Sequence, residues 1–251
     1  MTIAVVGGTG TLGSLVVADL LGRGERVAVL SRRADGVPAG AEHRGVDLTA
    51  GQDLDHALDG VSAVVDASNS QKEAEKTLVD GTRRLLEAGA RTGVAHHLTI
   101  SIVGCDLLPI SYYKVKVAQE RALEAGEVPW TLLRATQFHQ LLDTYLAAAA
   151  RFGVRPTGKA RLQPVDPTVV AARLADAALT GPAGRLPDIS GPRVQTLSEL
   201  SAAWAAARGK LRLPLRVPAW GKIGKGLAAG ALCDETAAAP CEDFEEWLRH
   251  E

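Results

Sequence analysis

Tyr112 and Lys116 are the side chains whose types and spacing best suit them to transfer a proton. Residues four apart share one face of a helix, and the residue four beyond Tyr113 is Val117, so only Tyr112 has a lysine in this position. A tyrosine hydroxyl has a reference pKa near 10. Efficient proton transfer at neutral pH would require this pKa to fall by about three units, which corresponds to roughly 4 kcal/mol. We expect the charge of Lys116 to supply part of that lowering.

A glycine-rich loop, Gly7-Gly8-Thr9-Gly10-Thr11-Leu12-Gly13, lies between an apolar strand pattern at residues 3–6 and an amphipathic run at residues 14–21. Glycines in this context allow a sharp turn and bring backbone N–H groups and the positive end of the next helix close to a pyrophosphate. The strand before the loop and the helix after it supply the context that this motif requires. The pattern therefore predicts a dinucleotide site that uses Gly7, Thr9, Gly10, Thr11 and Leu12.

The residues that end the second predicted strand indicate which dinucleotide binds. An acidic residue there would accept hydrogen bonds from the adenosine ribose, but this sequence has Ser31-Arg32-Arg33. The planar guanidinium of arginine suits a phosphate, so Ser31, Arg32 and Arg33 favour NADP(H) over NAD(H). The alternative is that both arginines belong to a solvated loop.

Two further strand ends complete the predicted nucleotide site. Asp47 and Leu48 follow a weaker strand near residues 43–46, and we expect them to contact the adenine amino group and ring face. Ala67, Ser68 and Asn69 follow the strand at residues 63–67, and we expect them to pass beside the adenosine ribose and the diphosphate. Carboxyl ends of parallel strands share one edge of a sheet, which brings these segments to the glycine loop.

Strand and helix patterns alternate through the first two thirds of the chain, which predicts an α/β fold with a Rossmann-type doubly wound parallel sheet. Residues 27–30, 63–67, 98–101 and 131–133 read as strands, and residues 71–92, 112–125, 137–151 and 167–179 read as helices. We therefore expect a nucleotide-binding domain at residues 1–180. Residues 181–251 are expected to form a small, partly helical substrate cap that does not fold independently, with Trp204, Trp220 and Trp247 in its core or pocket wall.

The composition of the 251 residues fits a protein of small-molecule chemistry. A formal net charge of -1 argues against a dedicated nucleic-acid binder. Three cysteines without C-x-x-C spacing indicate neither a disulfide framework nor a zinc site, and His96-His97 has no third ligand nearby in sequence. With no signal-like leader and no long apolar run, the sequence predicts a cytoplasmic protein without membrane, nucleic acid or metal as partner.

The glycine spacing, Asp47-Leu48, Tyr112-x-x-x-Lys116 and the segment from Leu133 to Phe138 together resemble the short-chain dehydrogenase/reductase superfamily, and most closely its atypical, NmrA-like branch. The resemblance covers residues 1–179. It implies NADP(H) in the crevice, Tyr112 as proton donor and Lys116 on the nicotinamide ribose. It also implies that Ala135, Thr136 and Phe138 line the nicotinamide end. Ser101 is the hydroxyl that remains for catalysis, because Ile102 and Val103 stand where relatives carry Ser or Thr.

These observations predict an NADP-dependent oxidoreductase that reduces a carbonyl or conjugated ketone of a small organic substrate. His139 and Gln140 begin the helix after the sixth strand and are expected to contact that substrate. The absence of a hydroxyl at Val103 leaves a second hypothesis, an NADP-binding redox sensor that regulates a partner without turnover. A third hypothesis is an epimerase, lyase or isomerase that uses the bound nucleotide without net redox change.

Overall fold

The computed structural model describes residues 1–209 and 212–251, which form two compact units built from interleaved segments of the chain. The first unit comprises Met1–Ser101, Lys114–Leu133 and Val170–Leu186. The second unit comprises Ile102–Tyr113, Arg134–Val169 and Pro187–Glu251. The chain thus passes between the units several times, whereas the sequence suggested one boundary at residue 180; which residues bind nucleotide and which cover substrate stays a prediction.

Among the described residues, a seven-stranded sheet has the order β3-β2-β1-β4-β5-β6-β9, and the pairs β3-β2, β2-β1, β1-β4, β4-β5 and β6-β9 are parallel. The strand order reverses between β1 and β4, the arrangement of a doubly wound nucleotide-binding sheet. Buried apolar residues fill β1, β2 and β4 on both faces, as expected for strands covered on both sides. The strands are β1 (Thr2–Val6), β2 (Arg26–Ser31), β3 (Glu42–Gly45), β4 (Ala63–Asp66), β5 (His96–Ile102), β6 (Trp130–Ala135) and β9 (Gly184–Arg185). The predicted Rossmann-type fold is confirmed.

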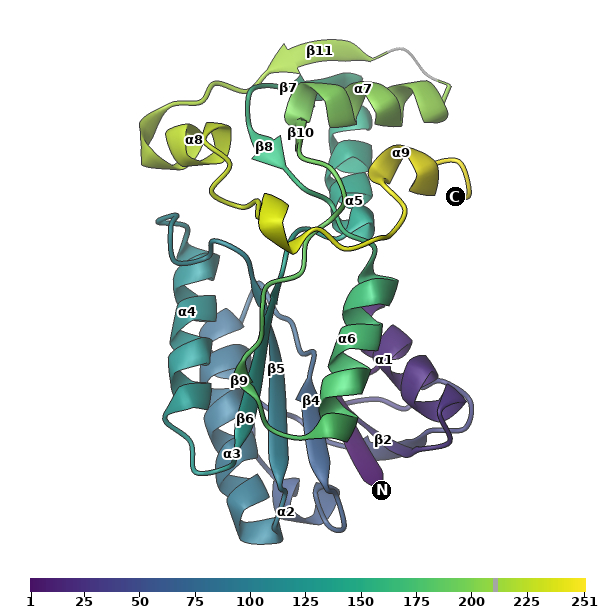
Figure 1. The fold of residues 1–251 in the computed structure, drawn as a ribbon, viewed down its shortest axis with the longest axis vertical. Helices are drawn as coiled ribbons and strands as arrows, with labels where there is room; N and C mark the ends of the chain where they lie inside the picture. Colours follow the sequence, from purple (N-terminus) through teal and green to yellow (C-terminus); the bar gives the residue numbers. More distant parts are fainter. Residues whose placement is uncertain (210–211) are drawn as a thin grey trace. The chain divides into compact units, whose positions relative to one another are not determined.

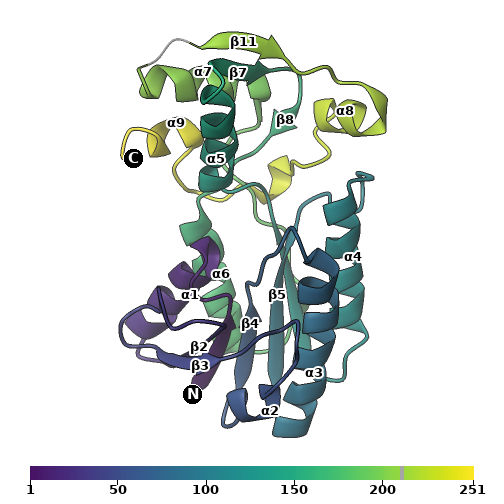
Figure 2. The same ribbon diagram turned by 180° about the vertical axis from the view of Figure 1, so that it is seen from behind.

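Helices lie against both faces of this sheet (Figures 1 and 2). On one face lie α2, α3 and α4, and on the other lie α1 and α6, which an ion pair between Arg23 and Asp176 joins. Their bounds are α1 (Thr11–Gly22), α2 (Leu54–Ala57), α3 (Gly81–Thr92), α4 (Ser111–Glu124) and α6 (Pro167–Thr180). The helix predicted from residue 71 begins with a turn, in which the Ser70 hydroxyl accepts the N–H of Glu73. A π-helical segment, η1 (Glu75–Asp80), then leads into α3.

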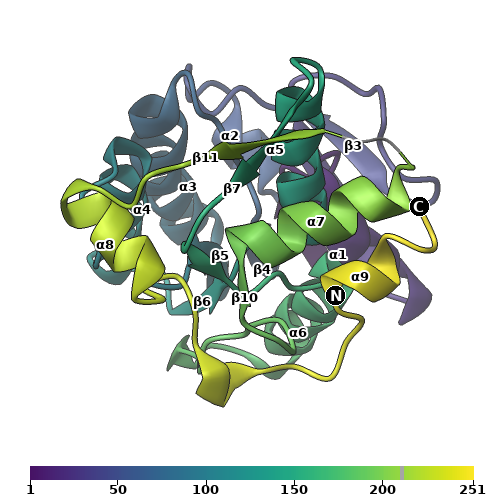
Figure 3. The same cartoon turned by 90° about the horizontal axis from the view of Figure 1, so that it is seen from above.

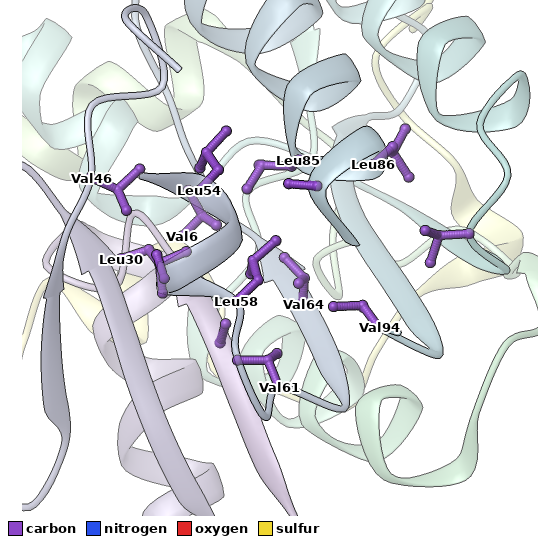
Figure 4. Packing of buried hydrophobic residues seen from close by; sticks show 14 of the residues in the cluster. Val6, Leu30, Val46, Leu54, Leu58, Val61, Val64, Leu85, Leu86 and Val94 are labelled. Carbon is purple, nitrogen blue, oxygen red and sulfur yellow. The ribbon is translucent and has the colours of Figure 1, made fainter. Parts of the chain in front are cut away.

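The core under α2 and α3 follows from the alternation of side chains along the strands (Figure 4). Val6, Leu30 and Val64 point from β1, β2 and β4 toward Leu58 and Leu85 on the helices. Burial of each such side chain contributes about 1.5–3 kcal/mol. This packing fixes the strand ends that carry the predicted nucleotide site.

The second unit has its own core beneath α5 (His139–Ala150), α7 (Leu197–Ala207) and α9 (Phe244–Trp247). Capping boxes start two of these helices, Thr196 with Glu199 for α7 and Asp243 with Glu246 for α9. Its strands pair as β10 (Gln195–Thr196) with β8 (Arg161–Leu162), and as β11 (Leu213–Arg216) with β7 (Val154–Thr157). The remaining short helices are α8 (Gly221–Ala228) and η2 (Glu235–Ala237).

The tryptophans of this unit divide between core and surface. Trp204 and Trp247 are buried as predicted, whereas Trp220 is 81% exposed, because it lies in the extended segment between β11 and α8. Among the described residues, no helix combines the length and the apolar character needed to cross a bilayer.

Candidate active site

The glycine loop between β1 and α1 has a shape that side chains would block. Gly7 has a φ of +72°, and a Cβ on it would lie 2.8 Å from the carbonyl oxygen of Ala67. A Cβ on Gly13 would lie only 2.2 Å from the carbonyl oxygen of Gly7. Glycine is therefore required at Gly7 for both conformation and space, and at Gly13 for the close approach of α1 to the loop.

The N-terminal turn of α1 can bind an anion. Gly10 is the N-cap residue, no side chain caps the helix and no acidic residue lies in the first turn. The N–H of Gly10 donates to Gly7 at 2.9 Å, but the first N–H groups of a helix have no acceptor within it. Thr9, Gly10 and Thr11 are exposed, whereas the Leu12 side chain is buried, so Leu12 can offer a ligand only its backbone. This arrangement fits a pyrophosphate.

The segment after β4 lies against the glycine loop, whereas the contact of Ala67 and Ser68 with a nucleotide stays a prediction. Ala67 donates its N–H to Val6 at 3.0 Å, and Ser68 donates its N–H to the carboxylate of Asp66 at 3.0 Å. The Ser68 hydroxyl is buried without a hydrogen-bond partner, although such groups are rarely left unsatisfied. A hydroxyl of this kind beside an anion-binding loop fits a bound nucleotide, and Asn69 follows it on the exposed side.

The ends of β2 and β3 hold the residues expected to select the nucleotide. The Ser31 hydroxyl donates to the backbone oxygen of Arg33 at 2.7 Å, which shapes the turn, and both arginines are exposed. Hydrogen bonds from Thr49 hold the pKa of Asp47 below its ordinary value, and the nearby positive charge of Arg32 adds to this effect. The structure thus brings Arg32 and Asp47 close together.

Leu48, predicted to contact adenine, belongs to the hydrophobic core and is 8% exposed. A Cβ on Gly81 of α3 would lie 3.3 Å from its side chain. Leu48 therefore anchors this strand end by packing, and its contact with adenine stays a prediction.

Lys116 is buried at the centre of a polar network in the first unit. Its ammonium donates to the backbone oxygen of Ile100 on β5 at 2.8 Å and to the side-chain oxygen of Gln119 at 2.5 Å. The amide nitrogen of Gln119 in turn donates to the carboxylate of Asp66 at 3.3 Å and to the hydroxyl of Thr82 at 3.2 Å. Hydrogen bonds therefore link the lysine to the end of β4, beside the glycine loop.

Sequence reasoning missed Asp66, Thr82 and Gln119. The only signal for Asp66 is an acidic residue directly after the apolar residues of β4, where a buried carboxylate requires partners. Gln119 lies three residues after Lys116, a spacing at which helix side chains meet. Thr82 carries no sequence signal, because its role depends on how α3 packs.

Tyr112 and Tyr113 lie side by side at the start of α4, with ring centroids 6.3 Å apart, and both are half-buried. Burial raises the pKa of Tyr112 to about 12, and the neighbouring Tyr113 and Tyr145 add to the rise. Burial likewise raises the pKa of Tyr113 to about 12. The expected lowering at Tyr112 is therefore absent in this structure, because burial disfavours the charged phenolate.

Ser101 is buried near the end of β5, and residues 134–169, which include the end of β6, belong to the second unit. There the backbone oxygen of Ala135 accepts the N–H of Val103 at 3.0 Å, and the hydroxyl of Thr136 accepts the N–H of Gly191 at 3.2 Å. Phe138 is half-buried at the N-cap of α5. The predicted nicotinamide contacts of Ala135, Thr136 and Phe138 stay predictions.

His139 is fully buried in the core of the second unit. Its ring lies 5.8 Å from that of Phe244 and 5.6 Å from that of Trp247, and its Nε2 hydrogen-bonds with the backbone oxygen of Glu242 at 3.1 Å. Burial lowers the pKa of His139. These contacts argue for a structural role and against direct substrate contact. Gln140 is half-buried, and its side-chain oxygen is buried without a partner.

A cavity of about 300 Å³ lies elsewhere in the first unit, between β3 and α2. Arg44 lines the cavity, and its guanidinium donates to the backbone oxygens of Ala57 and Asp59, both at 2.9 Å. None of the predicted site residues lines this cavity. We therefore assign the cavity no part in the predicted nucleotide site.

The parallel sheet, the uncapped helix after a glycine loop and the buried lysine define a Rossmann-type dinucleotide-binding protein. A family model described as NAD(P)H-binding matches residues 7–177. The chain belongs to this NAD(P)H-binding family, and the expected cofactor type is thereby confirmed.

Curated relatives resemble part of the chain in sequence. Photosystem II assembly factor Ycf39 of Trieres chinensis is 32% identical over 155 residues, which cover 58% of this chain and 49% of that protein. The chain spans about half the length of the curated relatives it matches first.

Solved structures resemble the whole chain at low sequence identity. An NADPH-dependent quinone oxidoreductase of Escherichia coli, complexed with NADPH, has a TM-score of 0.83 at 20% identity and 99% coverage of both chains. A nucleoside-diphosphate-sugar epimerase of Staphylococcus aureus has a TM-score of 0.80 at 18% identity, covering 99% of this chain and all of its own. These likenesses establish the fold and agree with the resemblance to the short-chain dehydrogenase/reductase superfamily.

Proposed function

We propose that the protein is an NADP-dependent oxidoreductase that reduces a carbonyl or conjugated ketone of a small organic substrate. The observation that carries this proposal is the buried ammonium of Lys116, held by Ile100 and Gln119, on the same helix as Tyr112 in an NAD(P)H-binding chain. When bound, NADPH supplies the hydride for such a reduction.

Each residue of the site has a defined task in this proposal. The loop amides at Gly10, Thr11 and Leu12 hold the diphosphate, and Arg32 and Arg33 hold the 2′-phosphate. Lys116 orients the nicotinamide ribose. Tyr112 gives its proton to the carbonyl oxygen as that oxygen gains charge, and Ser101 donates a hydrogen bond to the same oxygen.

The pKa of Tyr112, raised to about 12 by burial, sets a requirement on this mechanism. A phenol with this pKa stays protonated and can donate, but it donates more readily when positive charge stabilises the phenolate. We assign that charge to Lys116, which lies four residues further along α4. Loss of Lys116 should then slow proton transfer more than it weakens NADPH binding.

Turnover measurements on variants at Tyr112 test the proposal. NADPH oxidation is followed with a panel of quinones and ketones for the wild type, Tyr112→Phe and the matched control Tyr113→Phe. Positioned proton donation contributes about 10² to 10⁴ in rate, so Tyr112→Phe should lose that factor while Tyr113→Phe loses little. Equal losses for the two variants, with NADPH binding retained, would contradict the role of Tyr112.

A second function is an NADP-binding regulator without turnover. It is favoured by Val103, which places a buried apolar side chain where relatives of the superfamily carry a hydroxyl, and by the name of the assembly-factor relative. Binding of NADPH without oxidation of NADPH by any substrate of the panel would favour this function. A non-redox epimerase, lyase or isomerase is the third, and it would convert a substrate into a product of equal oxidation state.

A further inference from the structure

An exposed apolar edge distinguishes the second unit. Its members are apolar residues on and beside β7, β11 and α8 that face solvent: Phe152, Leu213, Leu215, Val217, Trp220 and Ile223. Phe152 is 84% exposed, Leu213 75% and Trp220 81%, so these side chains contribute little to the core of their own unit. Large exposed apolar groups gathered on one part of a protein mark a site of interaction.

Backbone pairing places β11 beside β7, and α8 follows β11 in the chain (Figure 3). The N–H of Leu213 donates to the backbone oxygen of Gly153, next to Phe152, and the N–H of Val217 donates to that of Thr157. Leu213, Leu215 and Val217 alternate along the chain and so point to one side of the strand. Trp220 and Ile223 follow within six residues, at the start of α8.

The charge around this apolar edge has one sign. Between Glu199 and Asp234 the sequence contains six Lys or Arg residues and no Asp or Glu. Four exposed cations at the edge, Arg151, Arg216, Lys222 and Lys225, make no ion pair within the described part of the chain. Acidic residues resume only at Asp234, in the segment that forms η2 and α9.

We propose that this apolar edge binds the surface of an anionic lipid bilayer. An exposed tryptophan suits the headgroup region, because its apolar ring can contact the acyl chains while its N–H hydrogen-bonds with headgroups or water. Leucine, valine and isoleucine side chains can insert at the boundary between headgroups and acyl chains. Each nearby Lys or Arg contributes about 1 kcal/mol to the binding free energy at an anionic surface. Lysine is depleted in protein interfaces, so Lys222 and Lys225 favour lipid over a protein partner or a second copy.

Peripheral binding of this kind needs no membrane-spanning helix. The sequence-based expectation of no membrane partner rested on the lack of a long apolar run, and that lack concerns spanning segments alone. The lipid surface is independent of the nucleotide site, because its residues take no part in the proposed chemistry.

Sedimentation with vesicles tests the proposal on the full chain. Vesicles of phosphatidylcholine with phosphatidylglycerol are compared with vesicles of phosphatidylcholine alone, at low and at high salt. The wild type should bind the anionic vesicles, and raised salt should release it. The double variant Lys222→Glu/Lys225→Glu should bind them at least about tenfold more weakly, since both attractions become repulsions.

Apolar substitutions test the other half of the surface. Trp220→Ser and Leu215→Ser should each reduce binding several-fold, whereas Leu141→Ser, which changes a 42% exposed leucine of α5, should not. Unchanged NADPH binding and thermal unfolding show that each variant is folded. Equal binding to both vesicle types, no binding to either, or self-association that Trp220→Ser abolishes would overturn the proposal.

Discussion

The ammonium of Lys116 donates a hydrogen bond of 2.5 Å to the side-chain oxygen of Gln119, three residues further along α4. Because Gln119 also donates to Asp66 at the end of β4, the position of the lysine depends on the sheet as well as on its own helix. These hydrogen bonds hold the ammonium of Lys116 in one position, and such preorganisation is what the proposed role of this lysine requires.

Replacement of Gln119 should therefore impair the site without unfolding it. Gln119→Ala removes one acceptor from Lys116, and hydrogen bonds to charged groups contribute about 1.5–3 kcal/mol. We expect kcat/KM for NADPH oxidation to fall roughly tenfold to a hundredfold, with a changed pH profile. Gln71→Ala, at an exposed glutamine, is the control. A normal pH profile in Gln119→Ala would mean that the lysine does not need this contact.

Gly13→Ala should abolish NADPH binding and destabilise the fold. The new Cβ would lie 2.2 Å from the carbonyl oxygen of Gly7, so α1 or the loop must shift. Gly22→Ala is the matched control on the same helix, because a Cβ there meets no atom within 4 Å, and it should stabilise the protein by about 0.5–1 kcal/mol. Denaturant unfolding and titration with NADPH measure both effects. If Gly13→Ala bound NADPH normally, the loop would not be the diphosphate site.

Arg32→Ala should weaken NADPH binding and leave NADH binding unchanged. Loss of a hydrogen-bonded charge on the 2′-phosphate removes about 1.5–3 kcal/mol, or roughly tenfold or more in Kd. Arg26→Ala, at the opposite end of β2, is the control for a general change of charge. Calorimetric titrations with both nucleotides decide the point. Equal affinities of the wild type for NADPH and NADH would remove the basis for the phosphate contact.

Acid should destabilise the first unit through His96 and His97. Burial lowers the pKa of each to about 4, against 6.5 for an unperturbed histidine. Between those values the unfolded chain binds more protons than the folded chain, so the free energy of unfolding falls as pH decreases from about 6.5 to about 4.

Denaturant unfolding across this pH range measures the loss in the free energy of unfolding. Each histidine contributes about 1.4 kcal/mol to this loss for each unit by which its pKa is lowered. His96→Gln should have a shallower pH dependence than the wild type. His56→Gln, at an exposed histidine of α2, should match the wild type. A wild-type free energy that stays flat over this range would show that both histidines accept protons without unfolding.

The sequence alone determined the alternating α/β fold, the glycine loop and the start of α4, because each depends on local patterns: apolar runs, glycine spacing and helix periodicity. It could not determine the contact of Gln119 with Asp66 or the contacts of His139 with Phe244 and Trp247, because these join residues far apart in the chain. The pKa of Tyr112 likewise depends on burial, and the 81% exposure of Trp220 excludes the core position, one of the two alternatives that its residue type suggested. Packing decides such positions, since a side chain's surroundings come from every element that lies against it.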